Sequence, residues 1–322
     1  MKRLNEINKW LKNILDGQNY TIEPASNDAS FRRYFRITSD QQTWILMDAP
    51  PEKENTQPFI QVARFLFKHN INVPKIEAHD KTLGFILLSD FGSHVYLDKL
   101  NQQSADRLYG LAIDGVISMQ QCPLQDIQLP LYDRTLLEQE LNLFPQWFLQ
   151  THLDIATPDF LEGVFNNLIE NALEQPQVFV HRDYHSRNLM DTDIQSPGII
   201  DFQDAVIGPI TYDLVSLLRD CYISWPEAKL EQWLQLYLTK MQANNQLQDI
   251  SLAQFTRWFD LMGLQRHIKV LGIFCRLNYR DNKSDYINDL PLTLHYVKQI
   301  SSKYSEFSEL SDFLQQPKIM EI

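Results

Sequence analysis

The sequence predicts an α+β, bilobal protein with a small antiparallel sheet in the N-terminal lobe and a large, mainly helical C-terminal lobe. The chain has 322 residues, which suffices for one large domain or two packed lobes. Short strand patterns dominate residues 20–90, and helical periodicity dominates the rest. No repeat or long linker separates these parts. We therefore expect lobes at residues 1–90 and 91–322 that join directly near residues 89–92.

Composition and charge exclude several classes of protein. Hydrophobic residues make up 44% of the chain, which is enough to build a core and excludes intrinsic disorder. The net charge of -12 disfavours nucleic acid as a partner. The three cysteines are far apart, without metal or disulfide spacing, which fits a reducing cytoplasm. Because no signal peptide or membrane span is visible, we expect a soluble, cytoplasmic protein, and no feature indicates an obligate protein partner.

The first lobe begins with an amphipathic helix over residues 1–17 and continues as strands around a single helix. That helix, residues 58–69, places Phe59, Val62 and Leu66 on one face, and the following Asn70 and Pro74 end it. The strands are predicted at residues 31–37, 43–47, 75–78 and 84–88. A small sheet with one helix against it is the expected result.

The second lobe reads as a series of helices interrupted once. Two short apolar strands, residues 178–181 and 198–202, flank a polar loop in the middle of the helical region. Loops of this kind carry function more often than packing. The helices are predicted at residues 96–120, 134–149, 158–173, 212–223, 227–241, 252–278, 290–303 and 306–314.

The polar loop carries the strongest motif in the chain. Residues 181–188 read H-R-D-Y-H-S-R-N, and the next apolar strand carries an aspartate. Phosphoryl transfer needs a base that orients the acceptor hydroxyl and oxygen ligands for the metal that holds the phosphates. Asp183 suits the first role, and Asn188 with Asp201 suits the second, as ligands of Mg²⁺. An aspartate and an asparagine at this spacing could simply cap a turn, but the whole pattern favours a kinase site.

At these residues the sequence resembles the aminoglycoside phosphotransferase and choline kinase group, which shares the protein-kinase-like fold. His185, two positions after Asp183, matches the H-x-D-x-H pattern of those small-molecule kinases. Only eleven residues separate Asp201 from Asp213, which leaves no room for a protein-kinase activation segment. Asp213 resembles the aspartate that braces the catalytic loop in that group, although a plain helix cap is an equal alternative. The resemblance implies ATP as co-substrate and a small acceptor.

More narrowly, four segments resemble the anomeric N-acetylmuramate/N-acetylglucosamine kinases of bacterial cell-wall recycling. These segments are residues 26–37, 47–55, 180–190 and 201–222. The resemblance implies phosphorylation of the C1 hydroxyl of the amino sugar by ATP, giving a sugar 1-phosphate for peptidoglycan recycling.

The nucleotide-binding part departs from that group. The phosphate-covering loop, residues 27–33, has no glycine, and we expect Ser30 and Phe31 at its tip. Met47 and Asp48 stand where the group places a phosphate-binding lysine. Strand alternation favours Arg33 as the replacement cation, because it shares the parity of the apolar residues around it. Arg32, Arg36 and Lys53 are the alternatives. The adenine is expected at the hinge, near Leu88, Asp90 and Phe91.

The acceptor site is expected near Asp183 in the helical lobe. A sugar needs paired polar groups and an aromatic face, and a helix surface position is the alternative for each candidate. The candidates for the sugar are Glu140 with Trp147, Arg219, Asp220 and Tyr222, and Arg187 is expected to face the transferring phosphate. Two other functions stay open at this point. One is a kinase of another small alcohol, such as an aminoglycoside, choline or homoserine. The other is a non-catalytic nucleotide-binding regulator, which is favoured because both the phosphate-binding lysine and the glutamate that usually pairs with it are absent.

Overall fold

The computed structural model describes residues 2–26, 31–40 and 42–322. The chain divides into two units. Unit 1 comprises Met1–His94 and Met190–Asp204, and unit 2 comprises Val95–Leu189 and Ala205–Ile322. The first boundary lies four residues beyond the one expected from the sequence. The segment that follows the loop at residues 181–188 differs more, because it groups with unit 1 and not with the helical unit.

The sheet of unit 1 has five strands in the order β1-β2-β3-β5-β4, with antiparallel neighbours. The strands are β1 (Thr21–Ser26), β2 (Arg33–Thr38), β3 (Thr43–Asp48), β4 (Ile76–Asp80) and β5 (Phe85–Ser89). The sequence predicted the last four. It missed β1, which is short and contains Pro24. This strand lies at the edge of the sheet, where a proline is tolerated although it has no N–H to donate to a neighbouring strand.

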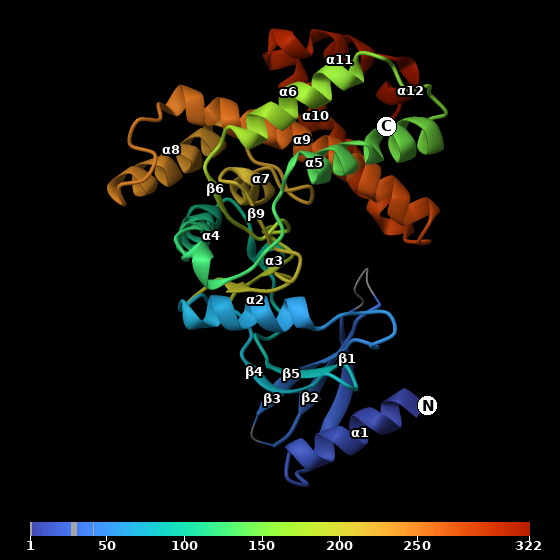
Figure 1. Cartoon of the computed structure of the whole chain (residues 1–322), viewed down its shortest axis with the longest axis vertical. Helices are drawn as coiled ribbons and strands as arrows, with labels where there is room; N and C mark the ends of the chain where they lie inside the picture. The colour runs from blue at the N-terminus through green and yellow to red at the C-terminus, as the bar shows by residue number, and fades with distance from the viewer. Residues whose placement is uncertain (1, 27–30, 41) are drawn as a thin grey trace. The chain divides into compact units, whose positions relative to one another are not determined.

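Two helices, α1 (Lys2–Ile14) and α2 (Gln57–Lys68), cover opposite faces of this sheet (Figure 1). The face toward α1 forms one apolar cluster, made of Ile7, Trp10, Leu11, Leu15, Ile37, Trp44, Leu46, Phe85 and Leu87. Strand alternation turns Met47, Ile86 and Leu88 to the other face, and each is at most 3% exposed. Side chains on both faces of the sheet are therefore buried.

The segment Met190–Asp204 is tied to unit 1 by backbone and ring contacts. The N–H of Ile199 donates to the carbonyl of Asn72 at 2.8 Å, and Asn72 Nδ2 donates to the carbonyl of Gln195 at 2.6 Å. The rings of Phe202 and Phe59 of α2 lie 4.9 Å apart. The short strands β7 (Leu189–Met190) and β8 (Gly198–Ile199) pair where the chain enters this segment. These contacts explain why the segment groups with the sheet.

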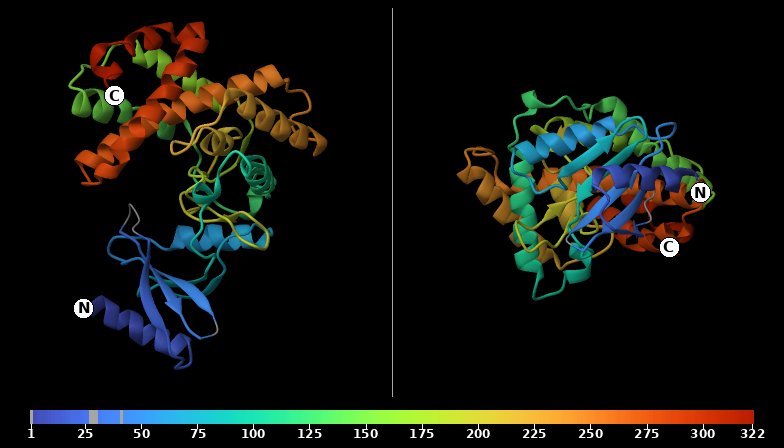
Figure 2. Two further views of the ribbon diagram at one scale, coloured as in Figure 1. Left: turned by 180° about the vertical axis from the view of Figure 1, so that it is seen from behind. Right: turned by 90° about the horizontal axis from the view of Figure 1, so that it is seen from below.

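Unit 2 is built around α9 (Leu252–Tyr279), which packs against α10 (Leu290–Lys303); Figure 2 shows these two helices side by side. Its two-stranded sheet pairs β6 (Gln177–Val180) with β9 (Val206–Pro209). The remaining helices are α3 (Tyr96–Lys99), α4 (Ala105–Gln120), α5 (Arg134–Leu141), the π-helix η2 (Phe144–His152), α6 (Leu161–Leu173), α7 (Tyr212–Leu218), α8 (Glu227–Ala243), α11 (Ser308–Phe313) and α12 (Pro317–Met320), with 3-10 turns η1 (Leu124–Asp126), η3 (Ser284–Asp289) and η4 (Ser305–Phe307).

Two of the predicted helices are interrupted, each for a local reason. The helix expected over residues 96–120 breaks between α3 and α4, where Asn101 Oδ1 accepts the N–H groups of Gln103 and Ser104 in a turn. The helix expected over residues 134–149 ends at Leu141 and continues as η2. Pro145 lacks the N–H that an uninterrupted helix would use at this point.

The three cysteines are free and buried, in agreement with their spacing. No helix in the described part of the chain is both long enough and apolar enough to cross a membrane.

Candidate active site

The loop with the H-x-D-x-x-x-x-N motif follows β6 directly and lies in unit 2. Arg182 has a φ of 78°, a strained conformation for a residue with a side chain. Asp213, in the first turn of α7, accepts the backbone N–H of His181 at 2.7 Å and that of Arg182 at 3.0 Å. Asp213 is fully buried. Its carboxylate therefore stabilises the strained start of the loop.

A second carboxylate holds the far end of the same loop. Asp220 Oδ2 accepts the backbone N–H of Ser186 at 3.0 Å and its hydroxyl at 2.5 Å. Within the loop, Asn188 Nδ2 donates to the carbonyl of Asp183 at 3.0 Å. The positions of Asp183 and Asn188 are thus set by hydrogen bonds on both sides of them.

Asp183 is half-buried among positive charges. Burial raises the pKa of its carboxyl, but the nearby charges outweigh burial and hold that pKa below the ordinary value of aspartate. The charges present at neutral pH belong to Lys269, Arg266 and Arg182. Asp183 is therefore a carboxylate at neutral pH, able to accept a hydrogen bond and then a proton from a hydroxyl group.

A buried group of charges supports Arg182 from α5 and α9. Glu140 makes an ion pair with Arg182 and accepts the hydroxyl of Tyr132, and Lys269 Nζ lies 3.5 Å from Glu140 Oε2. Lys269 also donates to the hydroxyl of Tyr212 at 2.5 Å. Burial raises the pKa of Glu140, but Lys269 and Arg182 hold it below its ordinary value. Glu140 was expected to contact the sugar, but its charge is used inside the protein.

Arg219 and Asp220 also differ from the expected sugar contacts. Arg219 is 1% exposed and pairs with Asp260 at 2.7 Å and with Glu227 at 3.4 Å. Asp220 is 1% exposed and binds Ser186 of the loop. These two residues have structural roles, because the end of α7 turns their side chains into the protein.

Arg187 and Tyr222 keep the character expected of an acceptor site. Arg187 is exposed, and its guanidinium carbon lies 3.5 Å from the centroid of the half-buried Tyr222 ring. The ring of His185 meets the same tyrosine edge to face, with centroids 5.3 Å apart. The three side chains form one aromatic and cationic surface, and two of them, His185 and Arg187, belong to the loop that carries Asp183.

The expected hinge residues lie at the end of β5 in unit 1. Leu88 is buried within the sheet, and Phe91 packs its ring against Gly198. The carboxylate of Asp90 pairs with Arg36 at 2.7 Å and accepts the N–H of Gly92 at 2.8 Å. The side chain of Asp90 therefore shapes this segment, while contact with adenine by the backbone remains a prediction.

Arg33 faces the side of the sheet that α1 covers. It pairs with Asp48, which is fully buried and also pairs with Arg3 at 2.6 Å. The parity of Arg33 with Phe35 and Ile37 is as the sequence indicated, but the apolar face that they share packs against α1. This differs from the expectation that Arg33 faces the nucleotide.

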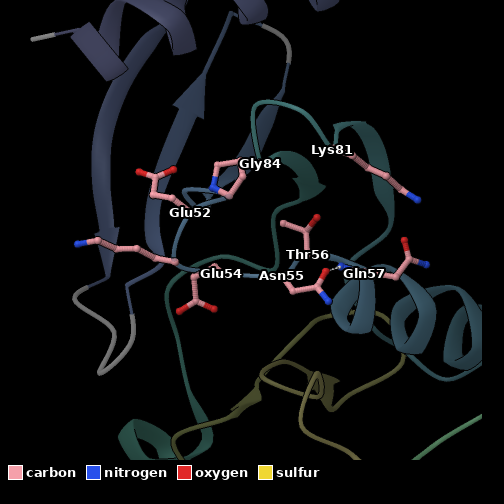
Figure 3. A pocket seen from close by; sticks show the side chains of 9 residues that line it. Glu52, Glu54, Asn55, Thr56, Gln57, Lys81 and Gly84 are labelled. Atoms are coloured by element: carbon pink, nitrogen blue, oxygen red, sulfur yellow. Dashed lines mark hydrogen bonds between the residues drawn. The ribbon is translucent and has the colours of Figure 1, made fainter.

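Ser30 lies outside the described residues, so its predicted phosphate contact stays a prediction. Phe31 is 62% exposed, and Lys53 Nζ lies 4.6 Å from the centroid of its ring. The backbone N–H of Phe31 donates to Glu54. A shallow pocket of about 470 Å³ lies beside these residues in unit 1 (Figure 3). Its lining includes Lys81 and Lys53, an alternative for the nucleotide-binding cation, but none of Phe31, Arg33, Leu88, Asp90 and Phe91.

The predicted metal ligands lie in different units, Asn188 in unit 2 and Asp201 in unit 1. Asp201 has a φ of 65°, and its Oδ1 accepts Gln203 Nε2 at 2.8 Å. No group of three or more His, Cys, Asp or Glu side chains in the described residues could hold a metal ion. An amide and a carboxylate oxygen nevertheless fit Mg²⁺, which proteins bind through few ligands together with substrate phosphates.

Lys269 and Arg266 are the residues near Asp183 that the sequence prediction missed. Both are buried in α9, in the run Gln265, Arg266, His267 and Lys269. This run of polar residues within a long, otherwise apolar helix could have indicated a site, because buried charges need a partner or a function.

Comparison with known proteins agrees with this geometry. Residues 21–247 match the family of phosphotransferase enzymes. The chain belongs to this phosphotransferase family. It is similar to N-acetylmuramate/N-acetylglucosamine kinases of Pseudomonas putida, with 42% identity over 91% of this chain and 87% of that protein, and of Pseudomonas aeruginosa, with 41% identity over 97% and 96%. The protein of that name in Neisseria meningitidis is 38% identical over 96% and 94%.

Two solved structures share the fold of this chain. The chain is similar to an ethanolamine kinase of Plasmodium vivax, with a TM-score of 0.67 and 14% identity over 91% of this chain and 86% of that one. It is also similar to an ADP-bound aminoglycoside phosphotransferase, with a TM-score of 0.60 and 15% identity over 92% and 98%. The predicted protein-kinase-like fold is confirmed, and the protein is an ATP-dependent phosphotransferase with an alcohol acceptor.

Proposed function

We propose that this protein transfers the γ-phosphoryl group of ATP to the anomeric C1 hydroxyl of N-acetylmuramate and N-acetylglucosamine. The products are ADP and sugar 1-phosphates, which would serve peptidoglycan recycling. The support for these acceptors is the name shared by three relatives, which align over 87% to 96% of their own length. Use of ATP and three free cysteines favour a cytoplasmic location.

The observation that carries the proposal is the position of Asp183 on a loop that Asp213 and Asp220 hold at both ends. The C1 hydroxyl donates a hydrogen bond to the carboxylate of Asp183, and its oxygen attacks the γ-phosphorus. The bond from phosphorus to the ADP oxygen breaks, and the hydroxyl proton passes to Asp183. Fixed hydrogen bonds along the loop hold the carboxylate in place for this step.

Asn188 and Asp201 would hold Mg²⁺ through their side-chain oxygens. When bound, the ion neutralises charge on the β and γ phosphates of ATP. The hydrogen bond from Asn188 Nδ2 to the Asp183 carbonyl sets the orientation of the Asn188 amide, so one contact positions both residues.

The nucleotide is assigned to the backbone around Leu88, Asp90 and Phe91 and to the loop with Ser30 and Phe31. Arg33 is not kept as the replacement for the family lysine, because Asp48 and the α1 side of the sheet engage it.

Phosphorus NMR of the purified protein with magnesium-ATP and each sugar tests the proposal. The expected result is a new phosphate signal coupled to the C1 proton of the sugar. A panel of other alcohols, including an aminoglycoside, choline and homoserine, serves as the control. Phosphorylation of one of these in place of both sugars would contradict the proposed acceptors, and ATP binding without any ADP formation would favour a regulator.

A further inference from the structure

Arg187 lies on the loop that carries Asp183. It follows Asp183 by four residues and precedes Asn188. Its neighbour Ser186 is bound through both its N–H and its hydroxyl to the buried Asp220. The backbone that carries Arg187 is therefore fixed, although the side chain is exposed.

The side chain of Arg187 is also held in one orientation. Its guanidinium stacks 3.5 Å from the centroid of Tyr222, and the N–H of Tyr222 donates to Asp220 at 3.2 Å. One carboxylate thus positions both the loop and the ring. Stacking uses the face of a guanidinium and leaves its N–H donors at the edge for a planar anion. A cation held in this way loses little entropy on binding.

Among the described residues Arg187 has no carboxylate partner within the protein, in contrast to a similar arginine elsewhere in unit 2. Arg257 stacks on Tyr304 at 5.2 Å and pairs with Glu306 at 2.7 Å. Among the residues that the structure describes, Arg187 makes no such ion pair. Asp289 lies in electrostatic range: burial raises its pKa and the charge of Arg187 opposes this effect. The donors of Arg187 are therefore suited to an anion from outside the protein.

His185 adds a second unused polar group to the same surface. Its Nδ1 atom is buried, and it has no hydrogen-bond partner in the described part of the chain. The imidazole contacts the Tyr222 ring that Arg187 covers. Buried polar atoms are normally paired, so this nitrogen is suited to a hydroxyl of the acceptor. The surface thus combines the aromatic ring of Tyr222, the imidazole of His185 and the cation of Arg187. This combination suits an acidic sugar better than it suits a free phosphate.

We propose that Arg187 binds the lactyl carboxylate of N-acetylmuramate and so sets the preference for this sugar over N-acetylglucosamine. The inference rests on the proposed function. The two sugars differ by the lactyl ether, which carries the only carboxylate. A guanidinium binds a carboxylate through two parallel hydrogen bonds, whereas N-acetylglucosamine has no group for this contact.

The test is kcat/KM for both sugars in the wild-type enzyme and in Arg187→Met and Arg187→Lys. For Arg187→Met we expect a loss of about 10- to 100-fold with N-acetylmuramate and of no more than about threefold with N-acetylglucosamine. Arg187→Lys keeps the charge and should recover part of the loss. Arg257→Met is the matched control, since it removes an arginine stacked on a tyrosine, and it should leave the ratio of the two sugars unchanged.

The outcomes separate this inference from the proposed function. A wild-type enzyme that phosphorylates neither sugar overturns both. If the wild-type enzyme phosphorylates both sugars and Arg187→Met lowers kcat/KM equally for them, Arg187 contacts the transferred phosphate and the inference is overturned alone. An unchanged ratio in Arg187→Met and Arg187→Lys, with both variants folded by circular dichroism, overturns it as well.

Discussion

The two units stabilise their chains in different ways. In unit 2, buried carboxylates bind the loop that carries Asp183: Asp213 and Asp220 accept its backbone N–H groups, and Glu140 pairs with Arg182. In unit 1, apolar packing on both sides of the sheet dominates, and an exposed arginine neutralises the buried Asp48. A strained loop needs directional contacts, whereas a sheet between two helices needs mainly burial.

Removing the carboxylate of Asp183 should have the largest effect. Asp183→Asn loses the group that accepts the hydroxyl proton, and we expect turnover to fall about a thousandfold or more with magnesium-ATP binding kept. Steady-state kinetics and calorimetric titration measure the two quantities. Asp193→Asn, an exposed position after the loop, is the control. Turnover near the wild-type value would contradict the role of Asp183.

Glu140→Gln tests the buried charges behind the loop. It leaves Arg182 and Lys269 without their shared anion, and we expect the free energy of unfolding to fall by about 3 kcal/mol or more. Urea denaturation measures the change. Glu138→Gln on the same helix is the matched control, because Glu138 is half exposed and its pair with Arg134 should contribute less than about 1 kcal/mol. Equal losses in the free energy of unfolding for both variants would contradict the prediction that the buried ion pairs of Glu140 stabilise the protein more than the exposed pair of Glu138.

The pH dependence of stability should report on Asp213. Burial, as the largest cause, raises the pKa of its carboxyl from 3.8 to about 6 in the folded protein. A group with a raised pKa contributes stability at low pH that is lost as the pH rises through the folded value. Relative to Asp213→Asn, the wild-type free energy of unfolding should therefore decrease between about pH 4 and 7, by up to about 3 kcal/mol. Urea denaturation of both proteins across this range measures the difference, and a constant or rising difference would disprove the shift.

Arg33→Met should have the smallest effect. The Arg33 side chain is 52% exposed, and Arg3 also pairs with Asp48, so we expect a loss below about 1 kcal/mol in the free energy of unfolding. The KM for ATP should stay within about twofold of the wild-type value. Thermal denaturation and ATP-dependent kinetics measure both. A tenfold rise in this KM would instead assign Arg33 to the nucleotide.

Much of the fold follows from local patterns. Four of the five sheet strands and the helices α2, α8 and α10 were predicted from periodicity close to their observed bounds. The errors have local causes, such as the edge strand with Pro24 and the helix that Pro145 changes to a π-helix. The grouping of residues 190–204 with the sheet could not be predicted, because it depends on contacts with Asn72 and Phe59, more than a hundred positions earlier.

The sequence by itself determined the reaction class, because Asp183, Asn188 and Asp201 form a motif whose spacing is local to one loop and the next strand. Tertiary structure alone decided the roles of the charged residues around that motif. Arg219 and Asp220 are buried, Arg33 faces α1, and Arg187 remains exposed over Tyr222. Spacing along a chain sets which groups can act together locally, but the burial of a charge depends on which distant elements cover it.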